Sequence, residues 1–320
     1  MTLNRTNHIN FIHKLINDRQ SSGYFMTISI RTNNYYWALG VLYLLDAIDQ
    51  IDKKETVDFI LSTQSECGGF GGNTNFDPHI HTTLSAIQCL IFLDSIDKID
   101  KEKVCRWVAS LQNPDGSFKG DEWGEVDTKF AYCGLSILSL LGHLDYIDVS
   151  RTVDWILSCQ NFDGGFGCVP GCESHAGQIF SSLAALSIAN ALNKIDKNEI
   201  DALGLFLSER QDYETGGLYS RPEKLADVCY TWWVGASLAI IDKKDWINAE
   251  NLEKFVLSAQ NSEIGGIADV PGHQADPFHT FFGLAGLSIF HCQKLPEMDP
   301  VYAMPKNVLE KHFLSLKNQS

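Results

Sequence analysis

Two kinds of apolar segment alternate along this chain. In the first kind, apolar residues recur at helical spacing between charged positions, as at Val104, Trp107, Val108 and Leu111. In the second kind, such as "FAYCGLSILSLLG" and "FFGLAGLSIF", nearly every position is apolar or small. A helix with one apolar face covers a core from outside, whereas a helix that is apolar on all sides is buried. The pattern therefore predicts amphipathic outer helices that alternate with buried inner helices.

A glycine-rich turn that follows a glutamine recurs between the two kinds of segment. It reads "QSECGGF" from residue 64, "QNPDGSF" from 112, "QNFDGGF" from 160, "QDYETGGL" from 211 and "QNSEIGGI" from 260, at spacings of 48, 48, 51 and 49 residues. A nearly fixed period of this size indicates stacked supersecondary units. Each repeat is therefore predicted to contain an outer helix, a glycine turn and an inner helix.

Stacked helix pairs can form an open superhelix or close into a ring, and the spacing is compatible with both. Because the inner segments are apolar on nearly every side, we expect an all-α fold, a closed α-α barrel (α/α toroid) of repeated helix pairs. No linker rich in Pro, Gly or Ser divides the sequence. Residues 1–320 are therefore expected to form a single domain, with an N-terminal helix at about 4–18 and an irregular tail after about 293.

Charge and composition limit the partners and the compartment. The net charge is −15, so nucleic acid and anionic membrane surfaces would repel the chain, and any phosphate site must be local. No stretch reaches the roughly 18 uncharged apolar residues of a membrane-spanning helix, and the start lacks the pattern of a signal peptide. We therefore expect a cytoplasmic protein that is not integral to a membrane, with its nine scattered cysteines mostly reduced.

A polar residue stands 15 or 16 positions after each repeat glutamine, where an inner helix should begin. These residues are His79, Asp127, His175, Asp227 and Asp276. Asp is a favoured N-cap and suits the positive end of the helix dipole. Helix capping is the preferred interpretation for His79 and Asp127.

Asp227 has Cys229 two residues later, and His279 follows Asp276 in the next repeat. Residues i and i+2 diverge by about 200° in a regular helix, but they converge if the first still lies in the extended segment ahead of it. A carboxylate, a thiolate and an imidazole with an open fourth position are typical of catalytic zinc. Chance composition, or a helix cap beside a buried thiol, is the alternative interpretation.

Cationic residues cluster around the same helix start. Arg221, Lys224 and Tyr230 flank it, and His175 holds the equivalent position one repeat earlier. Two cations, an imidazole and a phenol near converging helix N-termini form a candidate anion site. Alternatively, Arg221 and Lys224 are solvated loop residues.

The segments "GEVDTKFAYC", "NFDGGFGCVPGCESHAGQIF", "RPEKLADVCYTWW" and "DPFHTFFGLAGLS" resemble motifs of protein prenyltransferase β subunits, in particular the Rab-type (type II) geranylgeranyltransferases. The resemblance extends from about Tyr35 to Met304. It implies a barrel of six helix pairs bound to a helical-repeat α subunit. The implied site residues are Asp227, Cys229 and His279 for zinc, and His175, Arg221, Lys224 and Tyr230 for the prenyl diphosphate.

The resemblance also implies a reaction. Zinc coordinates the sulfur of a substrate cysteine and keeps it as a thiolate, which attacks C1 of geranylgeranyl diphosphate while the cations stabilise the departing diphosphate. In the Rab-type enzymes, the substrates are C-terminal cysteines of Rab GTPases presented by a Rab escort protein.

Lipid length and a second metal are further implications of the resemblance. Asn33 and Leu84 take the places of bulky aromatic residues that close the pocket floor in farnesyltransferases, although Rab-type enzymes carry Ser where Asn33 stands. Smaller floor residues favour a twenty-carbon lipid. Candidate wall residues are Tyr36, Trp37, Tyr132, Trp232 and Trp233, with core packing as the alternative for each. Asp269 aligns with a carboxylate associated with Mg²⁺ in farnesyltransferases, and an exposed loop carboxylate is the alternative.

Other functions are compatible with parts of the pattern. A farnesyltransferase or type I geranylgeranyltransferase β subunit is the alternative within the family. A triterpene cyclase shares the barrel, but the chain has no D-x-D-D motif and is short for two barrels. A non-catalytic barrel that binds partners would need no metal ligands, and the Cys-Gly-Glu-Gln stretch of the thioester kind is absent.

Overall fold

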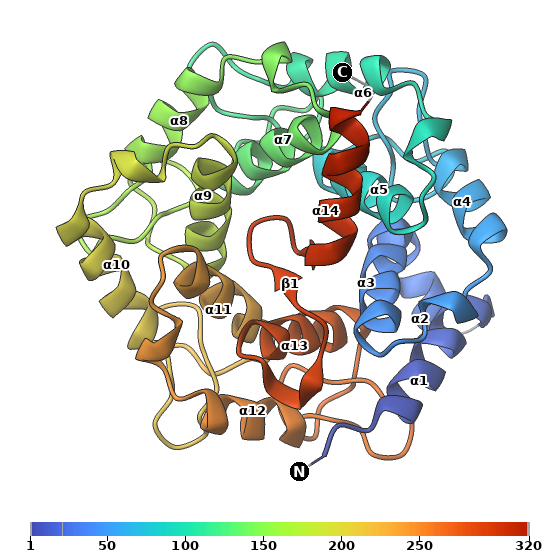
Figure 1. The fold of residues 1–320 in the computed structure, drawn as a ribbon, viewed down its shortest axis with the longest axis vertical. Coiled ribbons are helices and arrows are strands. Elements are labelled where there is room, and N and C mark those ends of the chain that lie inside the picture. Colours follow the sequence, from blue (N-terminus) through green and yellow to red (C-terminus); the bar gives the residue numbers. More distant parts are fainter. Residues whose placement is uncertain (1, 21, 319–320) are drawn as a thin grey trace.

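The computed structural model describes residues 2–20 and 22–318, which form two concentric rings of helices (Figure 1). The inner ring consists of α3 (Arg31–Leu44), α5 (Ile80–Phe92), α7 (Thr128–Leu141), α9 (Ala176–Ile188), α11 (Tyr230–Ile240) and α13 (Pro277–Ile289). Each inner helix packs against the next, and α13 packs against α3. The predicted closed all-α barrel is therefore confirmed.

The outer ring covers these helices with amphipathic ones. It consists of α1 (Arg5–Asn17), α4 (Lys53–Ser62), α6 (Lys101–Ser110), α8 (Val149–Ser158), α10 (Lys197–Ser208) and α12 (Ala249–Ser258). Helix α1 is the N-terminal helix that the sequence predicts. Shorter elements complete the connections: α2 (Ser22–Met26), η1 (Ile28–Ile30), η2 (Ile48–Gln50), η3 (Ile96–Lys98), η4 (Leu144–Tyr146), η5 (Leu192–Lys194) and η6 (Lys244–Trp246).

The repeated glycine turns join neighbouring helix pairs. Gly116 has a φ of +92°, which favours glycine, and a side chain there would overlap the carbonyl group of Arg151 in the next outer helix. The last turn makes the same kind of contact with the first outer helix, since a side chain at Gly265 would overlap the carbonyl group of Asn7. The repeat thus continues from the end of the chain to its beginning, which closes the ring.

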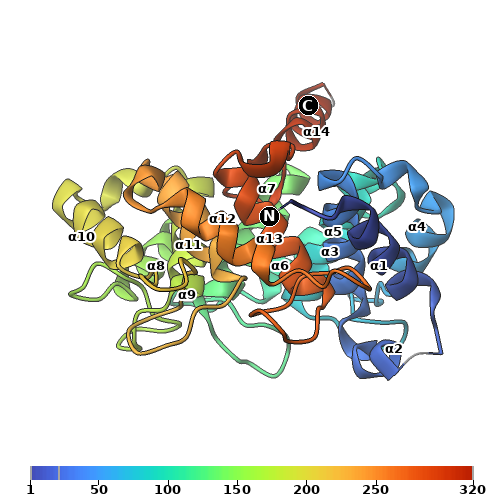
Figure 2. The same cartoon turned by 90° about the horizontal axis from the view of Figure 1, so that it is seen from below.

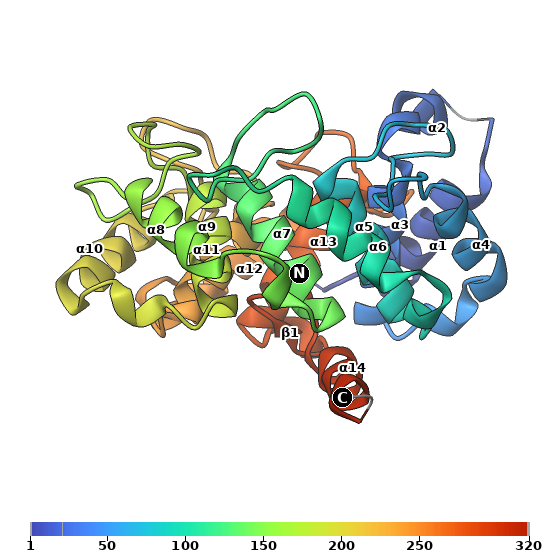
Figure 3. The ribbon, with the colours of Figure 1, turned by 90° about the horizontal axis from the view of Figure 1, so that it is seen from above.

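The inner helices all begin at the same end of the barrel. Figures 2 and 3 show long loops gathered on one face, with α14 (Lys306–Lys317) projecting from the opposite face. The side chains of His79, Asp127, His175 and Asp276 each accept a backbone N–H of the helix that they precede. The predicted capping roles of His79 and Asp127 are confirmed. With Asp227, which lies ahead of α11, the five polar residues of the repeat position lie at one end of the barrel.

The tail differs from the expectation. After η7 (Cys292–Lys294), the strands β1 (Met298–Asp299) and β2 (Met304–Pro305) pair antiparallel, and α14 follows. The expected irregular tail is wrong for this helix, because Leu309 and His312, three residues apart, bury one face of it against the ring. His312 Nε2 lies 2.6 Å from the carbonyl oxygen of Leu140 in α7. Within residues 2–20 and 22–318, no helix is long and apolar enough to cross a membrane.

Candidate active site

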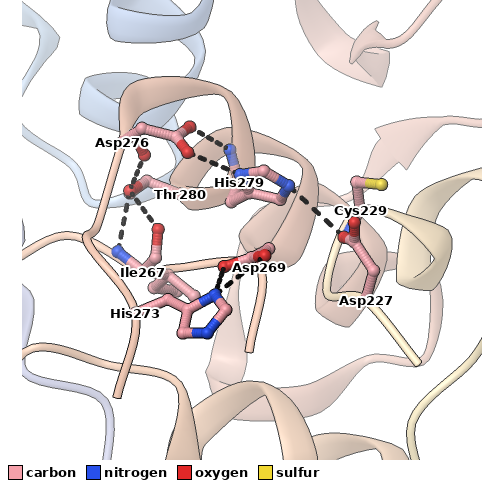
Figure 4. A network of polar contacts seen from close by, with 8 residues as sticks. All are labelled: Asp227, Cys229, Ile267, Asp269, His273, Asp276, His279 and Thr280. Carbon is pink, nitrogen blue, oxygen red and sulfur yellow. Dashed lines mark hydrogen bonds and ion pairs between the residues drawn. The ribbon is translucent and has the colours of Figure 1, made fainter. Parts of the chain in front are cut away.

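Asp227, Cys229 and His279 meet at the end of the barrel where the inner helices begin (Figure 4). Asp227 lies in a non-helical segment ahead of α11, and its Oδ1 accepts the backbone N–H of Cys229 at 2.8 Å. Cys229 is the N-cap residue of α11, while His279 lies in the first turn of the neighbouring α13. One ligand atom from each residue lies within 4.8 Å of the others. The three residues therefore converge as the metal-site hypothesis requires.

Asp276 orients His279 within this cluster. Its Oδ1 accepts the backbone N–H of His279 at 2.9 Å, and its Oδ2 lies 2.6 Å from Nδ1 of the same residue. The opposite ring nitrogen, Nε2, faces Asp227 Oδ1 at 3.3 Å. A carboxylate on one imidazole nitrogen fixes the ring and the tautomer in which the other nitrogen can bind a metal.

The electrostatics of the cluster are those of a site that favours a cation. Burial lowers the pKa of His279, but hydrogen bonds to Asp227 and Asp276 outweigh it and bring the pKa to about 9. Burial and the neighbouring Asp227 carboxylate raise the pKa of the Cys229 thiol well above its usual range. Burial opposes ionisation of Asp227, yet its hydrogen bonds to His279 and Cys229 lower its pKa overall. A positive charge at this point would favour the thiolate and the neutral imidazole together.

The donor set fits a metal ion. It offers one oxygen, one sulfur and one nitrogen, with the thiol buried and the other two side chains partly exposed. These three residues can hold a metal and leave a coordination position free for another group.

Two of the four residues predicted for the anion site are in contact. His175 Nδ1 accepts the N–H of Gly177 at 3.1 Å, and Nε2 lies 3.3 Å from the Tyr230 hydroxyl. Burial and then the positive charge of Arg221 lower the pKa of His175. The neutral ring therefore carries its proton on Nε2, on the side of Tyr230.

The two predicted cations have different surroundings. Arg221 is partly buried and forms an ion pair with Glu173, with Nε 2.8 Å from the carboxylate. Lys224 is exposed in the loop before Asp227, and it forms no ion pair with any residue that the structure describes. Lys224 remains available to a ligand, whereas Arg221 would have to share its charge with Glu173.

Asp269 lies in the loop beside the candidate metal ligands (Figure 4). Its backbone carbonyl accepts the N–H of Val228, between two of them, at 2.8 Å. Its carboxylate is about 36% exposed and lies 3.0 Å from His273 Nδ1. The side chain is therefore close to the cluster but separate from it.

An apolar cavity of about 290 Å³ runs into the barrel from this end. Of the predicted pocket residues, Tyr36, Trp37, Leu84, Tyr132 and Trp233 line it, and His175 stands at its polar end. Phe278, the residue before His279, also lines it. The cavity and the candidate metal site are therefore adjacent.

Two predicted pocket residues do not line this cavity. Asn33 is about 1% exposed, and its amide donates to Ser85 Oγ at 2.8 Å, so that Ser85 stands at the wall in its place. Trp232 is fully buried between helices, with its ring 5.8 Å from that of Phe180. For Trp232, the alternative of core packing holds.

Lys129 and His81 line the polar end of the cavity, but the sequence interpretation did not select them. Both stand two residues after an N-cap, at the position that Cys229 holds relative to Asp227. Gly177 and Phe278 occupy the same position in α9 and α13 and also line the cavity. Applying the repeat register to this second position would have identified all of them.

Comparisons with known proteins agree with this geometry. The family described as "Prenyltransferase alpha-alpha toroid domain" matches residues 3–304. "Geranylgeranyl transferase type-2 subunit beta" of Saccharomyces cerevisiae is 45% identical over 315 residues, which cover 97% of each chain. "Geranylgeranyl transferase type-2 subunit beta 1" of Arabidopsis thaliana is 57% identical over 304 residues, which cover 95% of this chain and 94% of the relative.

A solved structure supports the fold. The structure described as "Candida albicans protein geranylgeranyltransferase-I complexed with GGPP" superposes with a TM-score of 0.86 over 98% of this chain and 99% of that chain, at 24% identity. The family match spans nearly the whole chain, and the two relatives named above align over nearly their full length. The chain therefore belongs to the prenyltransferase α-α toroid family, within the group of type-2 geranylgeranyl transferase β subunits.

Proposed function

We propose that this chain is the catalytic β subunit of a Rab geranylgeranyltransferase, which moves a geranylgeranyl group from geranylgeranyl diphosphate to C-terminal cysteines of Rab GTPases. The observation that carries the proposal is the cluster of Asp227, Cys229 and His279 beside an apolar cavity. The relatives in yeast and Arabidopsis are named as type-2 geranylgeranyl transferase β subunits, which supports transfer of a geranylgeranyl group. A candidate metal site beside an apolar cavity suits the transfer of a long lipid to a thiol.

The metal is proposed to be zinc, because zinc takes carboxylate, thiolate and imidazole ligands, and three protein ligands are typical of its catalytic sites. Bound at Asp227, Cys229 and His279, zinc would supply the Lewis acid that keeps a substrate cysteine ionised near neutral pH. Asp276 would hold the ring of His279 in the ligating orientation through its 2.6 Å contact.

The polar groups at the same end would receive the diphosphate. His175 and Tyr230 offer a ring N–H and a hydroxyl, and Lys129, Arg221 and Lys224 offer positive charge. As the bond between C1 and the bridging oxygen breaks, these groups would stabilise the negative charge that grows on the diphosphate. In a chain of net charge −15, such a local cluster can attract an anion without making the whole surface attractive to anions.

The cavity would hold the lipid. Its wall is mostly aromatic and aliphatic, with Trp37, Leu84 and Trp233 among the lining residues, so an isoprenoid chain would be transferred from water to an apolar surface. Asn33 would affect lipid length only through Ser85, whose hydroxyl accepts a hydrogen bond from the Asn33 amide.

Asp269 is proposed as a ligand of Mg²⁺ that accompanies the diphosphate. Protein sites for Mg²⁺ commonly use one or two carboxylates together with substrate phosphates. The carboxylate is partly exposed and close to the metal-binding residues, although it pairs with His273 in the free chain. In Asp269→Asn, transfer should need more Mg²⁺ than in the wild type, and an unchanged Mg²⁺ dependence would remove this role.

The proposed partners are a prenyltransferase α subunit and a Rab escort protein, in the cytoplasm. The relatives are named as β subunits, which supports a heterodimer.

The test is a transfer assay with the reconstituted heterodimer. The chain is co-expressed with its α subunit, its metal content is measured, and transfer of labelled geranylgeranyl and farnesyl groups to a Rab protein is followed with and without escort protein. We expect one zinc per heterodimer and geranylgeranyl transfer that depends on the escort protein. Cys229→Ala should lose both zinc and activity, whereas Cys105→Ala, which removes a buried thiol from outer helix α6, should keep both.

Two outcomes would contradict the proposal in different ways. Full activity without zinc would refute the role of the Asp227, Cys229 and His279 cluster. Zinc-dependent transfer to a short C-terminal cysteine peptide without escort protein would instead favour a farnesyltransferase or a type I geranylgeranyltransferase.

A further inference from the structure

The far end of the barrel, opposite the metal-binding cluster, is covered by the chain's own C-terminal segment. Figure 1 shows β1, the loop that follows it and α14 lying across the centre of the ring. Residues 298–305 form the hairpin of β1 and β2. The barrel therefore has one end with loops and a polar site, and one end that this hairpin obstructs.

The hairpin is attached to the inner helices by side chains that line the cavity. Three consecutive carbonyl groups each accept a hydrogen bond from a different inner helix. The pairs are Tyr36 Oη to Ala303 O at 2.6 Å, Gln88 Nε2 to Tyr302 O at 2.9 Å and Tyr132 Oη to Val301 O at 2.9 Å. These hydrogen bonds satisfy the polar ends of the three side chains, so that their apolar parts can line the cavity.

The cavity ends at this hairpin. Along α5 the lining residues run from His81 in the first turn to Gln88, which is seven residues and therefore about 10 Å further along the helix. Gln88 is the α5 side chain that binds the hairpin, as Tyr36 and Tyr132 do from α3 and α7, and Ala303 is the hairpin residue that lines the cavity. Ala303 thus stands at the closed end, and His81 and His175 stand at the polar end.

We propose that Ala303 forms the floor of the cavity and limits the length of the isoprenoid chain that the protein accepts. This inference rests on the proposed function and assigns lipid length to the C-terminal hairpin rather than to Asn33. Ala303 is small and about 6% exposed, so its methyl group leaves room that a larger side chain would take. Its φ of 53° is one that β-branched residues avoid, so a residue that is not branched at Cβ is the suitable probe.

The experiment measures binding of two lipids of different length to the heterodimer. Trp37 and Trp233 line the cavity, so quenching of tryptophan fluorescence can report the dissociation constants of farnesyl and geranylgeranyl diphosphate. The variants are Ala303→Leu, which fills the floor, and Ala303→Gly, which keeps the backbone conformation and leaves the floor open. Thermal unfolding of each heterodimer checks that the fold is intact, and Ala303→Met, with a more adaptable side chain, replaces Ala303→Leu if that variant does not fold.

Ala303→Leu should weaken binding of geranylgeranyl diphosphate by about 10-fold or more and leave binding of farnesyl diphosphate unaffected. Excess or missing bulk of a single methylene group changes discrimination in an apolar pocket by about 10–200-fold. Ala303→Gly should bind both lipids as the wild type does. Equal weakening of both lipids in Ala303→Leu, or no weakening of either, would overturn the inference while the proposed function stands. A wild-type heterodimer that binds neither lipid would refute the proposed function itself.

Discussion

Replacing Asp276 with Asn tests whether this residue makes His279 a metal ligand. The carboxylate has two separate tasks, since Oδ1 caps α13 at the N–H of His279 and Oδ2 lies 2.6 Å from Nδ1. Asn is as good an N-cap as Asp, so the amide oxygen can keep the first task. The amide nitrogen then faces Nδ1 and favours the tautomer whose proton is on Nε2, the nitrogen that should bind the metal.

The expected magnitude follows from these contacts. Loss of a carboxylate behind a histidine ligand typically costs 10–100-fold in metal affinity, which is about 1.4–2.8 kcal/mol. The helix cap is retained, so the free energy of unfolding of the metal-free protein should change by less than about 1 kcal/mol when it is measured above the His279 pKa of about 9, where no ion pair with Asp276 is lost. The variant should therefore bind zinc more weakly at nearly unchanged stability.

The assay is competition for zinc with a chromophoric chelator, combined with urea unfolding of the metal-free heterodimer. Asp127→Asn is the matched control, because Asp127 is also the N-cap of an inner helix but contacts no metal-binding residue. Zinc affinity in Asp276→Asn equal to that of Asp127→Asn would refute the orienting role. A large loss of stability in Asp276→Asn alone would show that the cap, rather than the contact with Nδ1, is the main function of this residue.

Two further predictions concern the stability of the barrel. Phe118 ends a repeat turn and is fully buried, so Phe118→Ala should lower the free energy of unfolding by about 3–5 kcal/mol, whereas Phe162→Ala, at a fully exposed position, should stay within about 0.5 kcal/mol of the wild type in urea unfolding. His8 of α1 accepts the N–H of Gly266 through Nδ1 at 2.9 Å, and burial lowers its pKa. Because the folded state favours neutral His8, its contribution should be full above the unfolded pKa of about 6.5 and fall as the pH drops below it. In His8→Gln, the urea midpoint should therefore fall less between pH 8 and pH 5 than it does in the wild type. An equal fall in both proteins would contradict this role of His8.

The helix pairs and their order follow from local features of the sequence. Outer helices show one apolar face and inner helices are apolar on all sides, and each turn carries a glycine at which a side chain would overlap the next unit, as at Gly116. Capping of α7 by Asp127 is likewise local, since the carboxylate binds an N–H two residues away. These properties depend on neighbours within a few residues or on a repeat that the sequence itself displays.

Tertiary structure decided the contacts between residues that are distant in the sequence. Ring closure depends on α13 packing against α3 and on Gly265 meeting α1, which the repeat spacing does not require. Trp232 is buried in the core, whereas the next residue, Trp233, lines the cavity. Successive side chains on α11 point about 100° apart, so the packing of the helix decides which of the two faces the cavity.

The site combines both kinds of information. The sequence by itself identified Asp227, Cys229 and His279 as ligands of one candidate metal site, because the repeat register places them at the starts of adjacent inner helices. It did not identify the hairpin at the far end, because no periodicity links Ala303 to Tyr36, which lies 267 residues earlier and donates to its carbonyl. A repeat specifies what adjacent units do, whereas the closed end of the cavity depends on a segment outside the repeat, and only folding brings that segment to the centre of the ring.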